Sequence, residues 1–366
     1  MTPEFNLIHQ HFKRSTQHTD LGVGDDAALI SVANGMQLAV SSDMLVAGTH
    51  FFDDCDPYQL GWKVLAVNLS DMAAMGAQAK WATLALALPN INNTWLNAFS
   101  EGFFACASEF NIDLIGGDTT RGALAISVQI MGEVPNGHAI KRSGAQIGDD
   151  IWVSGDLGSA AIGLAHLQNK ILLSGDTLSI CLKALHMPVP RLALGLALRD
   201  IATSCIDISD GLLADLGHIL EASNCGASLD LATIPCLDAL KQNLHDTQIQ
   251  ALLLAGGDDY ELCFTATKTQ RTAIEHPKYF LRVVPRARYT GTTASTAAGV
   301  SSNTAGNSPL HTLSWRNEAR LSRDIGLPGT ISSRVANRLD MPLPKPMMQR
   351  FKPACCAAYS TSAFKL

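Results

Sequence analysis

The stretch DPYQLGWKVLAVNLSDMAAMG, residues 56–76, decides how this chain folds. It predicts a helix over residues 57–75, with Asp56 as its cap, Pro57 in its first turn and Gly76 just past its end. One face of this helix should meet the core, and it carries Leu60, Val64, Val67, Asp71 and Met75. Burying an unpaired carboxylate is costly, so Asp71 either bonds to backbone donors or a lysine, or ligates a metal ion. The aspartates elsewhere in the chain favour the metal.

Short apolar segments alternate with amphipathic stretches on both sides of this helix, from about residue 21 to residue 265. Glycine or aspartate stands at nearly every junction, which is typical of a mixed α and β fold rather than a helical bundle. A second helix should begin after Ser209-Asp210-Gly211. The predicted strands cover residues 37–41, 83–88, 125–131, 150–154, 202–206 and 261–265.

Length and composition indicate two globular domains. The chain has 366 residues, of which 47% are hydrophobic and 16% charged, so it has ample material for a folded core. No apolar run approaches the ~20 residues that cross a bilayer, and residues 1–13 lack a signal-peptide core. Nine cysteines without a C-x-x-C pair predict neither a zinc site nor a disulfide framework. We therefore expect a soluble cytoplasmic protein that does not enter a membrane.

The charge of the chain changes sign near residue 275. Residues 276–366 hold 13 of the 27 Lys and Arg side chains but 3 of the 33 Asp and Glu side chains. Within them, residues 290–309 are Thr, Ser, Ala, Gly or Asn at 18 of 20 positions, which predicts a flexible linker or disorder. No recognised motif of basic and aromatic residues supports nucleic-acid binding, so we expect a solvated tail and no nucleic-acid partner. The predicted domains are residues 1–138 and 139–275, with a join at residues 135–148 and an atypical tail at 276–366.

Aspartate recurs where apolar segments end. The five instances are Gly24-Asp25-Asp26, Ser41-Ser42-Asp43, Gly116-Gly117-Asp118, Asp207-Ile208-Ser209-Asp210-Gly211 and Gly256-Gly257-Asp258-Asp259. Each one alone is more often a turn or a helix cap. Strand ends on one side of a sheet converge, and gathered carboxylates repel one another unless a cation neutralises them. Oxygen ligands without His or Cys select a hard ion, usually Mg²⁺ where phosphates complete its shell.

The sequence lacks the nucleotide motifs of the common kinases. It has no G-x-x-x-x-G-K-[ST] loop and neither an H-R-D nor a D-F-G triplet. The run Gly155-Asp156-Leu157-Gly158-Ser159 either cradles a phosphate with its backbone or forms a plain strand-to-helix turn. Arg121, Lys141-Arg142 and His50 are either phosphate contacts or surface groups. The residues alone predict a Mg²⁺-dependent enzyme that acts on a phosphate ester.

Six runs in the first 270 residues resemble the thiamine-monophosphate kinase family. They are GVGDDAA (22–28), SSDMLVAGTHF (41–51), AVNLSDMAAMGA (66–77), LIGGDTTRG (114–122), IDISDGL (206–212) and GGDDYEL (256–262). The Gly-Gly-Asp-Thr-Thr and Ser-Asp-Gly elements are shared with the wider aminoimidazole-ribonucleotide-synthetase-like superfamily. The Val-Ala-Gly-Thr-His-Phe and Asn-Leu-Ser-Asp segments together point to the thiamine family.

The resemblance implies a two-domain fold of that superfamily and a reaction. An N-terminal α/β domain would pair its sheet with that of a second subunit in a homodimer, and an α+β domain would follow. The enzyme would transfer the γ-phosphoryl group of ATP onto thiamine monophosphate. The implied Mg²⁺ ligands are Asp26, Ser41, Ser42, Asp43, Asp71, Asp118, Asp207 and Asp210. The implied ATP contacts are Gly117, Asp118, Arg142 and Ser209, and His50 and Asp258 would contact the thiamine phosphate.

Donor and acceptor of this reaction are both anions, so transfer needs positioning and charge neutralisation rather than a protein nucleophile. We therefore expect direct in-line transfer. One alternative is another ATP-using enzyme of the superfamily, such as aminoimidazole-ribonucleotide synthetase; a selenophosphate synthetase is disfavoured because no cysteine precedes Cys55. A catalytically inactive, metal-binding interaction protein is the alternative from another class.

Two features depart from the family pattern. The family commonly has glutamate where Asp258 stands, which makes this substrate contact one methylene shorter. The resemblance ends near Glu275, where the family continues as strands and ends near an aromatic residue that packs on the substrate. Trp315 is a candidate for that aromatic residue. A reading frame shifted after about residue 275 is one hypothesis, and resequencing the codons for residues 265–280 tests it.

Overall fold

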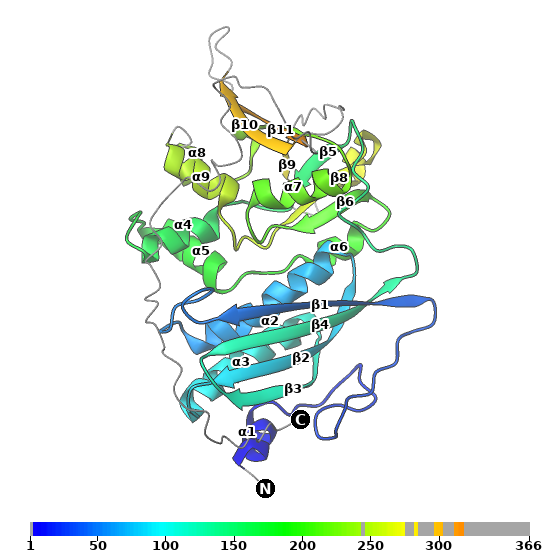
Figure 1. The fold of residues 1–366 in the computed structure, drawn as a ribbon, viewed down its shortest axis with the longest axis vertical. Helices are drawn as coiled ribbons and strands as arrows, with labels where there is room; N and C mark the ends of the chain where they lie inside the picture. Colours follow the sequence, from blue (N-terminus) through cyan, green and yellow to red (C-terminus); the bar gives the residue numbers. More distant parts are fainter. Residues whose placement is uncertain (1–2, 243–245, 275–281, 285–295, 303–310, 318–366) are drawn as a thin grey trace, which may run out of the picture.

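The computed structural model describes residues 3–242, 246–274, 282–284, 296–302 and 311–317 (Figure 1). The N-terminal domain contains α1 (Pro3–His11), β1 (Met36–Val46), α2 (Pro57–Ala74), β2 (Gln78–Leu88), α3 (Asn93–Phe110), β3 (Asp113–Arg121) and β4 (Ala125–Pro135). The second domain begins with β5 (Asp150–Val153), α4 (Ser159–Leu167), α5 (Gly175–His186), α6 (Leu192–Ala197), β6 (Ala202–Asp207), α7 (Leu212–Ala222), β7 (Ser228–Asp230) and η1 (Leu231–Thr233). It continues with α8 (Asp238–Lys241), α9 (Thr247–Ala255), β8 (Leu262–Ala266), η2 (Lys268–Gln270), α10 (Arg271–Ile274), β9 (Arg282–Val284), β10 (Thr296–Ser302) and β11 (His311–Asn317).

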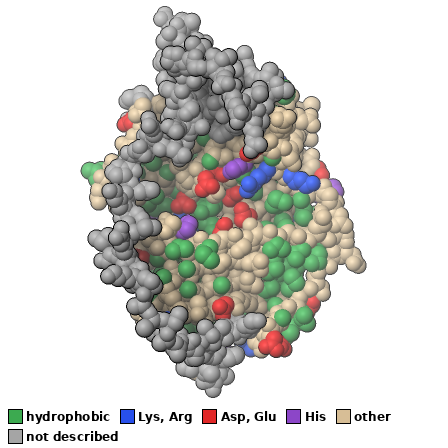
Figure 2. Space-filling view, in the orientation of Figure 1, with side chains coloured by type: hydrophobic (Ala, Val, Ile, Leu, Met, Phe, Trp, Pro, Cys, Tyr) green, Lys and Arg blue, Asp and Glu red, His purple; other side chains and the backbone are tan. Residues whose placement is uncertain are grey.

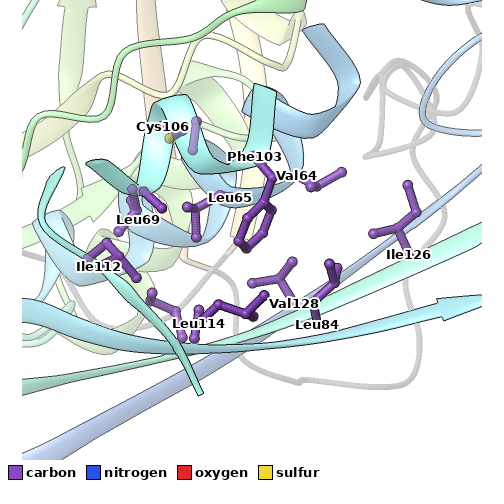
Figure 3. Packing of buried hydrophobic residues seen from close by; sticks show 14 of the residues in the cluster. Val64, Leu65, Leu69, Leu84, Phe103, Cys106, Ile112, Leu114, Ile126 and Val128 are labelled. Carbon is purple, nitrogen blue, oxygen red and sulfur yellow. The ribbon is translucent and has the colours of Figure 1, made fainter. Parts of the chain in front are cut away.

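The N-terminal domain is a sheet covered on one face by two helices. The strand order is β1-β4-β2-β3, with β4 antiparallel to β1 and β2, and β3 parallel to β2. Helices α2 and α3 lie on the inner face, while the outer face is turned toward the viewer in Figure 1. Val64, Leu65 and Phe103 from the helices are buried over strand residues such as Leu84 and Val128 (Figure 3). This apolar layer is the core that fixes α2 against the sheet.

Helix α2 begins and ends where its sequence predicts, to within one residue. The Asp56 side chain accepts a hydrogen bond of 2.9 Å from the backbone N–H of Gln59, which caps the first turn. Gly76 has φ +61°, the left-handed conformation that ends a helix. Helix α2 crosses α3 at two glycines, because a Cβ on Gly61 would lie 2.0 Å from the carbonyl oxygen of Phe99. The counterpart on α3 is Gly102.

Helix α2 also belongs to the second domain. Its last turn packs through Ala73 and Ala74 into a cluster with Trp152 and Phe264. The Trp62 indole N–H donates a hydrogen bond of 2.8 Å to the carbonyl oxygen of Pro188. Helix α2 therefore lies between the two domains. A side chain on the side of this helix that points away from the N-terminal core faces both domains.

The second domain contains two antiparallel sheets. One has the order β6-β8-β5-β9 and the other β10-β11-β7. Strands β9 and β11 come from the predicted tail and pair with β5 and β7, so residues after 275 contribute backbone to both sheets. The change from the first sheet to these two falls between Pro135 and Asp150. Among the described residues, no helix is long and apolar enough to cross a membrane.

The predicted strands are confirmed. Two other predictions are wrong: the linker at residues 290–309, and the placement of Asp43 and Asp118 after strand ends. The linker prediction for residues 290–309 fails at Thr296–Ser302, which form β10. Backbone pairing with β11 gives hydrogen-bond partners to the main chain of this small-residue segment. Asp43 and Asp118 do not follow strand ends but lie inside β1 and β3. Asp118 is tolerated because it lies on the outer face of the edge strand β3, and Asp43 is tolerated because it lines a cavity beside the edge strand β1.

Candidate active site

A cavity of about 510 Å³ lies between the two domains, over the open side of α2. Its walls come from β1 and the loop after it, from α2, from α4 and α5, and from the loops that follow β6 and precede β8. Figure 2 shows Asp and Glu side chains gathered between the two halves of the molecule, with His, Lys and Arg beside them. The structure brings these predicted site residues to the cavity: Asp43, His50, Asp71, Asp207, Ser209, Asp210 and Asp258.

Asp71 is the centre of the acidic group. The apolar stripe of α2 is buried as far as Val67, and Asp71 continues it as a partly exposed side chain on the cavity wall. The Ser41 hydroxyl donates a hydrogen bond of 2.6 Å to Asp71 Oδ2, so a second predicted ligand lies beside it. Burial raises the pKa of Asp71, while the Ser41 hydrogen bond and the charge of Arg142 act in the opposite direction.

Two further aspartates are perturbed by Asp71. Burial, and then repulsion by Asp71, raises the pKa of Asp43 to about 6. The same two causes raise the pKa of Asp207 to about 7. Because Asp71 raises the pKa of both Asp43 and Asp207, the three carboxylates are unfavourable together unless positive charge is brought to them.

Asp258 is held by two partners that the sequence did not reveal. Lys63 on α2 lies with its Nζ 3.1 Å from Asp258 Oδ2, and the Tyr260 hydroxyl donates a hydrogen bond of 3.0 Å to Oδ1. Lys63 and Tyr260 also line the cavity. The sequence feature that could have indicated this ion pair is a lysine in the middle of a buried helix, because a buried ammonium needs an anion beside it.

Asp215 organises the loop that carries Ser209 and Asp210. The backbone N–H groups of Ser209 and Asp210 each donate a hydrogen bond of 3.0 Å to Asp215 Oδ2. Gly211 has φ +106°, which lets the chain turn directly into α7. Asp215 is buried and does not line the cavity, so its role is to hold the Ser209-Asp210 turn.

Two predicted metal ligands lie on the other side of the N-terminal sheet. Ser42 alternates with Ser41 and Asp43 along β1 and is exposed on the outer face. Asp118 pairs with the exposed Ala85 and so faces the same way. β1 and β3 are three interstrand spacings apart, about 14 Å, so Ser42 and Asp118 cannot bind one ion within one chain.

The remaining predicted site residues lie around these two groups. Asp26 is exposed in the loop before β1, and Ala28 and Ile30 of this loop pack on the outer face of the sheet. Gly117 lies in β3 against β2, where a Cβ would be 1.8 Å from the carbonyl oxygen of Leu84. Arg142 is exposed but close enough for its charge to act on Asp71.

The glycine-rich turn before α4 is a plain strand-to-helix turn, not an open phosphate cradle. The N–H of Gly158 donates a hydrogen bond of 2.8 Å to Asp259 Oδ2, and the N–H of Ala160 also bonds to this carboxylate. The aspartate therefore occupies the position that an anionic ligand would take at this helix N-terminus. Burial raises the pKa of Asp259 to about 7 in spite of these two donors.

This raised pKa predicts a pH-dependent contribution of Asp259 to stability. The folded protein holds the Asp259 proton more tightly than the unfolded chain between the ordinary pKa of 3.8 and about 7. The free energy of unfolding should therefore fall as pH rises through this window. Asp259→Asn keeps an acceptor oxygen but does not titrate. Its free energy of unfolding, relative to that of the unsubstituted protein, should therefore rise by about 2 kcal/mol from pH 5 to pH 8.

Urea unfolding at both pH values measures this difference. Asp176→Asn, which changes an exposed acid in the first turn of α5, is the control and should show no such trend. An advantage of Asp259→Asn that is equal at pH 5 and pH 8 would contradict the prediction.

The donor groups at the cavity fit a hard divalent cation. Among the described residues, no three His, Cys, Asp or Glu side chains stand together as a complete metal-binding group. Magnesium does not need one, since it is usually bound by one or two carboxylates with water and substrate phosphates. The mutual repulsion of Asp43, Asp71 and Asp207 favours such an ion. On the other face of the sheet, Asp118 Oδ1 is buried and has no hydrogen-bond partner among the residues that the structure describes.

Comparison with known proteins gives the class of this fold. Residues 24–134 match the family described as AIR synthase related protein, N-terminal domain, which covers the loop of Asp26 and the whole N-terminal sheet. The thiamine-monophosphate kinase of Salmonella typhimurium is 49% identical over 276 residues, which are 74% of this chain and 85% of the relative. The chain belongs to the thiamine-monophosphate kinase family.

Solved structures of the same family have the same fold. The crystal structure of thiamine-monophosphate kinase from Stenotrophomonas maltophilia K279a aligns with a TM-score of 0.69 at 45% identity, over 79% of this chain and 93% of that one. AaThiL complexed with AMPPCP and TMP aligns with a TM-score of 0.64 at 27% identity, over 78% of this chain and 89% of that one. The predicted fold class and family are confirmed.

Proposed function

We propose that this protein uses ATP to phosphorylate thiamine monophosphate, giving thiamine diphosphate and ADP. The observation that carries this proposal is the acid-lined cavity between the domains in a chain of the thiamine-monophosphate kinase family. A related enzyme has been solved with AMPPCP and TMP bound, and its fold matches this one over most of both chains.

Magnesium ions are proposed to bind at Asp43, Asp71, Asp207 and Asp210, with Ser41 beside them. These side chains supply the oxygen donors that Mg²⁺ prefers. When bound, Mg²⁺ would neutralise the phosphates of both substrates. Asp26, Ser42 and Asp118 stay predictions from the family resemblance, because they lie apart from this group.

The proposed chemical step is direct. A phosphate oxygen of thiamine monophosphate forms a bond to the γ-phosphorus of ATP, and the bond from that phosphorus to the bridging oxygen breaks, so that ADP leaves with the electron pair. No protein side chain is phosphorylated. The role of the protein is to hold both anionic substrates in line and to exclude other orientations.

His50 is suited to hold the acceptor phosphate. Its Nδ1 accepts a hydrogen bond of 3.0 Å from the backbone N–H of Val46, so the neutral ring carries its proton on Nε2. His50 lines the cavity. Its Nε2–H is thus a donor for a phosphate oxygen, while Arg142 and the Ser209 turn are proposed to contact ATP.

The family resemblance also proposes a homodimer formed through the N-terminal sheet. Its outer face carries exposed apolar side chains on β1, with Val40 52% and Met44 60% exposed. Such a row on a flat sheet face favours burial against a second copy. Light scattering that gives the mass of a single chain would overturn this proposal. A cytoplasmic location, where ATP is available, is proposed as well and is checked by cell fractionation.

The purified protein should convert thiamine monophosphate and ATP to thiamine diphosphate and ADP in equal amounts, as measured by chromatography of the products. Treatment with EDTA should abolish the reaction, and a Mg²⁺ titration should restore it, because the cavity carboxylates repel both anionic substrates. An unchanged rate after EDTA would contradict the metal proposal. Absence of thiamine diphosphate would overturn the proposed function. Labelled phosphoryl trapped on the protein after incubation with γ-labelled ATP alone would overturn the direct step.

A further inference from the structure

Lys63 is an unusual side chain for its place in the fold. It lies on α2 with its side chain 7% exposed, although the neighbours of this helix position are apolar. Within the described part of the chain it is the one lysine or arginine that lines the cavity, which six aspartates also line. Its charge therefore offsets part of the negative charge that both anionic substrates must approach.

The ammonium of Lys63 reaches from the N-terminal domain to the second domain. Its partner, Asp258 Oδ2, lies 3.1 Å away on the loop before β8, and this carboxylate is 33% exposed. The other oxygen, Oδ1, accepts the Tyr260 hydroxyl at 3.0 Å. Both oxygens of Asp258 are thus fixed by side chains while one edge of the carboxylate stays open.

The backbone of this loop is held without Lys63. The N–H of Asp258 donates a hydrogen bond of 2.9 Å to the carbonyl oxygen of Ser209, and that of Tyr260 donates one of 2.8 Å to Ile208. Asp258 and Tyr260 have φ +69° and +49°, conformations that non-glycine residues adopt only where their surroundings impose them. Removing the ammonium should therefore leave the Asp258 carboxylate without its positive partner, while the loop stays in place.

We propose that Lys63 is a positioning residue that orients Asp258 toward thiamine monophosphate and neutralises its charge. This inference rests on the proposed function, since it assigns Lys63 to the acceptor side of that reaction. ATP binding is expected to change less, because three of its four proposed contacts, Gly117, Asp118 and Arg142, do not line the cavity, whereas Ser209 does.

The test compares Lys63→Met and Lys63→Gln, with KM for each substrate, kcat and Tm measured for every variant. Both substitutions should raise KM for thiamine monophosphate about tenfold or more, the effect of losing roughly one charged contact. KM for ATP should rise less than KM for thiamine monophosphate, since three of the four proposed ATP contacts lie outside the cavity. Lys63→Gln retains a donor for Asp258 and serves if the methionine variant does not fold.

A double-mutant cycle separates positioning from a general structural effect. Asp258→Asn should raise KM for thiamine monophosphate, and Asp258→Asn combined with Lys63→Met should add little to it, because Lys63 acts through Asp258. Lys80→Met is the matched control: Lys80 pairs with Glu133 at 2.5 Å on the N-terminal sheet and does not line the cavity. This control should leave both KM values unchanged.

An active enzyme whose KM for thiamine monophosphate is insensitive to the Lys63 substitutions would overturn this inference alone. Multiplicative effects in the double variant, or equal increases in both KM values, would also overturn it. A wild-type protein without thiamine-monophosphate kinase activity would overturn the proposed function and the inference together.

Discussion

Asp71→Asn should lower kcat by about a thousandfold or more while the protein stays folded. The carboxylate of Asp71 accepts the Ser41 hydroxyl, and its charge raises the pKa of both Asp43 and Asp207, so it is coupled to three other proposed ligands of the cation site. An amide has no charge and one acceptor oxygen, and it cannot replace a carboxylate in binding Mg²⁺. Initial rates at saturating ATP and thiamine monophosphate, over a range of Mg²⁺ concentrations, measure the effect.

The same substitution should not lower the free energy of unfolding. The charge of Asp71 raises the pKa of Asp43 and of Asp207, so removing this charge relieves repulsion in the metal-free protein. Asp176→Asn removes a negative charge from the surface of α5 and should keep full activity. A folded Asp71→Asn protein with more than a tenth of normal kcat would rule out the central role of Asp71.

Gly102→Ala should destabilise the N-terminal domain by about 3 kcal/mol or more. A Cβ on Gly102 would lie 1.9 Å from the carbonyl oxygen of Tyr58, a distance at which the two backbones must separate. Alanine favours a helix over glycine by about 1 kcal/mol, so propensity alone predicts the opposite sign. Separating α2 from α3 would open space around Phe99 and Phe103, which are fully buried, and the packing loss outweighs the propensity gain.

Urea unfolding followed by circular dichroism measures the loss. Glu101→Ala, at the exposed neighbouring position of α3, is the control and should leave stability nearly unchanged. Because Gly61 meets Phe99 in the same crossing, Gly61→Ala should act in the same direction. A Gly102→Ala protein as stable as the unsubstituted one would mean that the two helices do not cross this closely.

The sequence was most informative where local signals agree with the fold. The cap at Asp56, the apolar stripe and the glycine after the last turn predicted α2, and the aspartate in that stripe predicted the wall of the cavity. Local rules also explain the confirmed strands. The aspartates of the Ser-Asp-Gly turn and the Gly-Gly-Asp-Asp run reach the cavity because their loops follow and precede neighbouring strands.

The features that the sequence did not predict depend on contacts between residues far apart in the chain. Lys63 looks like any lysine in a helix until the fold brings Asp258 to it, and Asp215 reads as an ordinary first-turn acid of α7. Ser42 and Asp118 fit the motif pattern, but the register of the sheet turns them to the face opposite Asp43. Backbone pairing by β10 and β11 could not be read from a composition that lacks apolar periodicity.

The order of strands has a consequence for how the protein is made. The N-terminal sheet is complete once Pro135 has been synthesised, but β5 must wait for β8, which ends at Ala266. At about 5–20 residues per second, the ribosome needs roughly ten seconds to close that gap. During this time Ala73 and Ala74 lack the partners that cover them in the finished chain. We therefore expect the nascent N-terminal half to be the species that a chaperone protects on the ribosome.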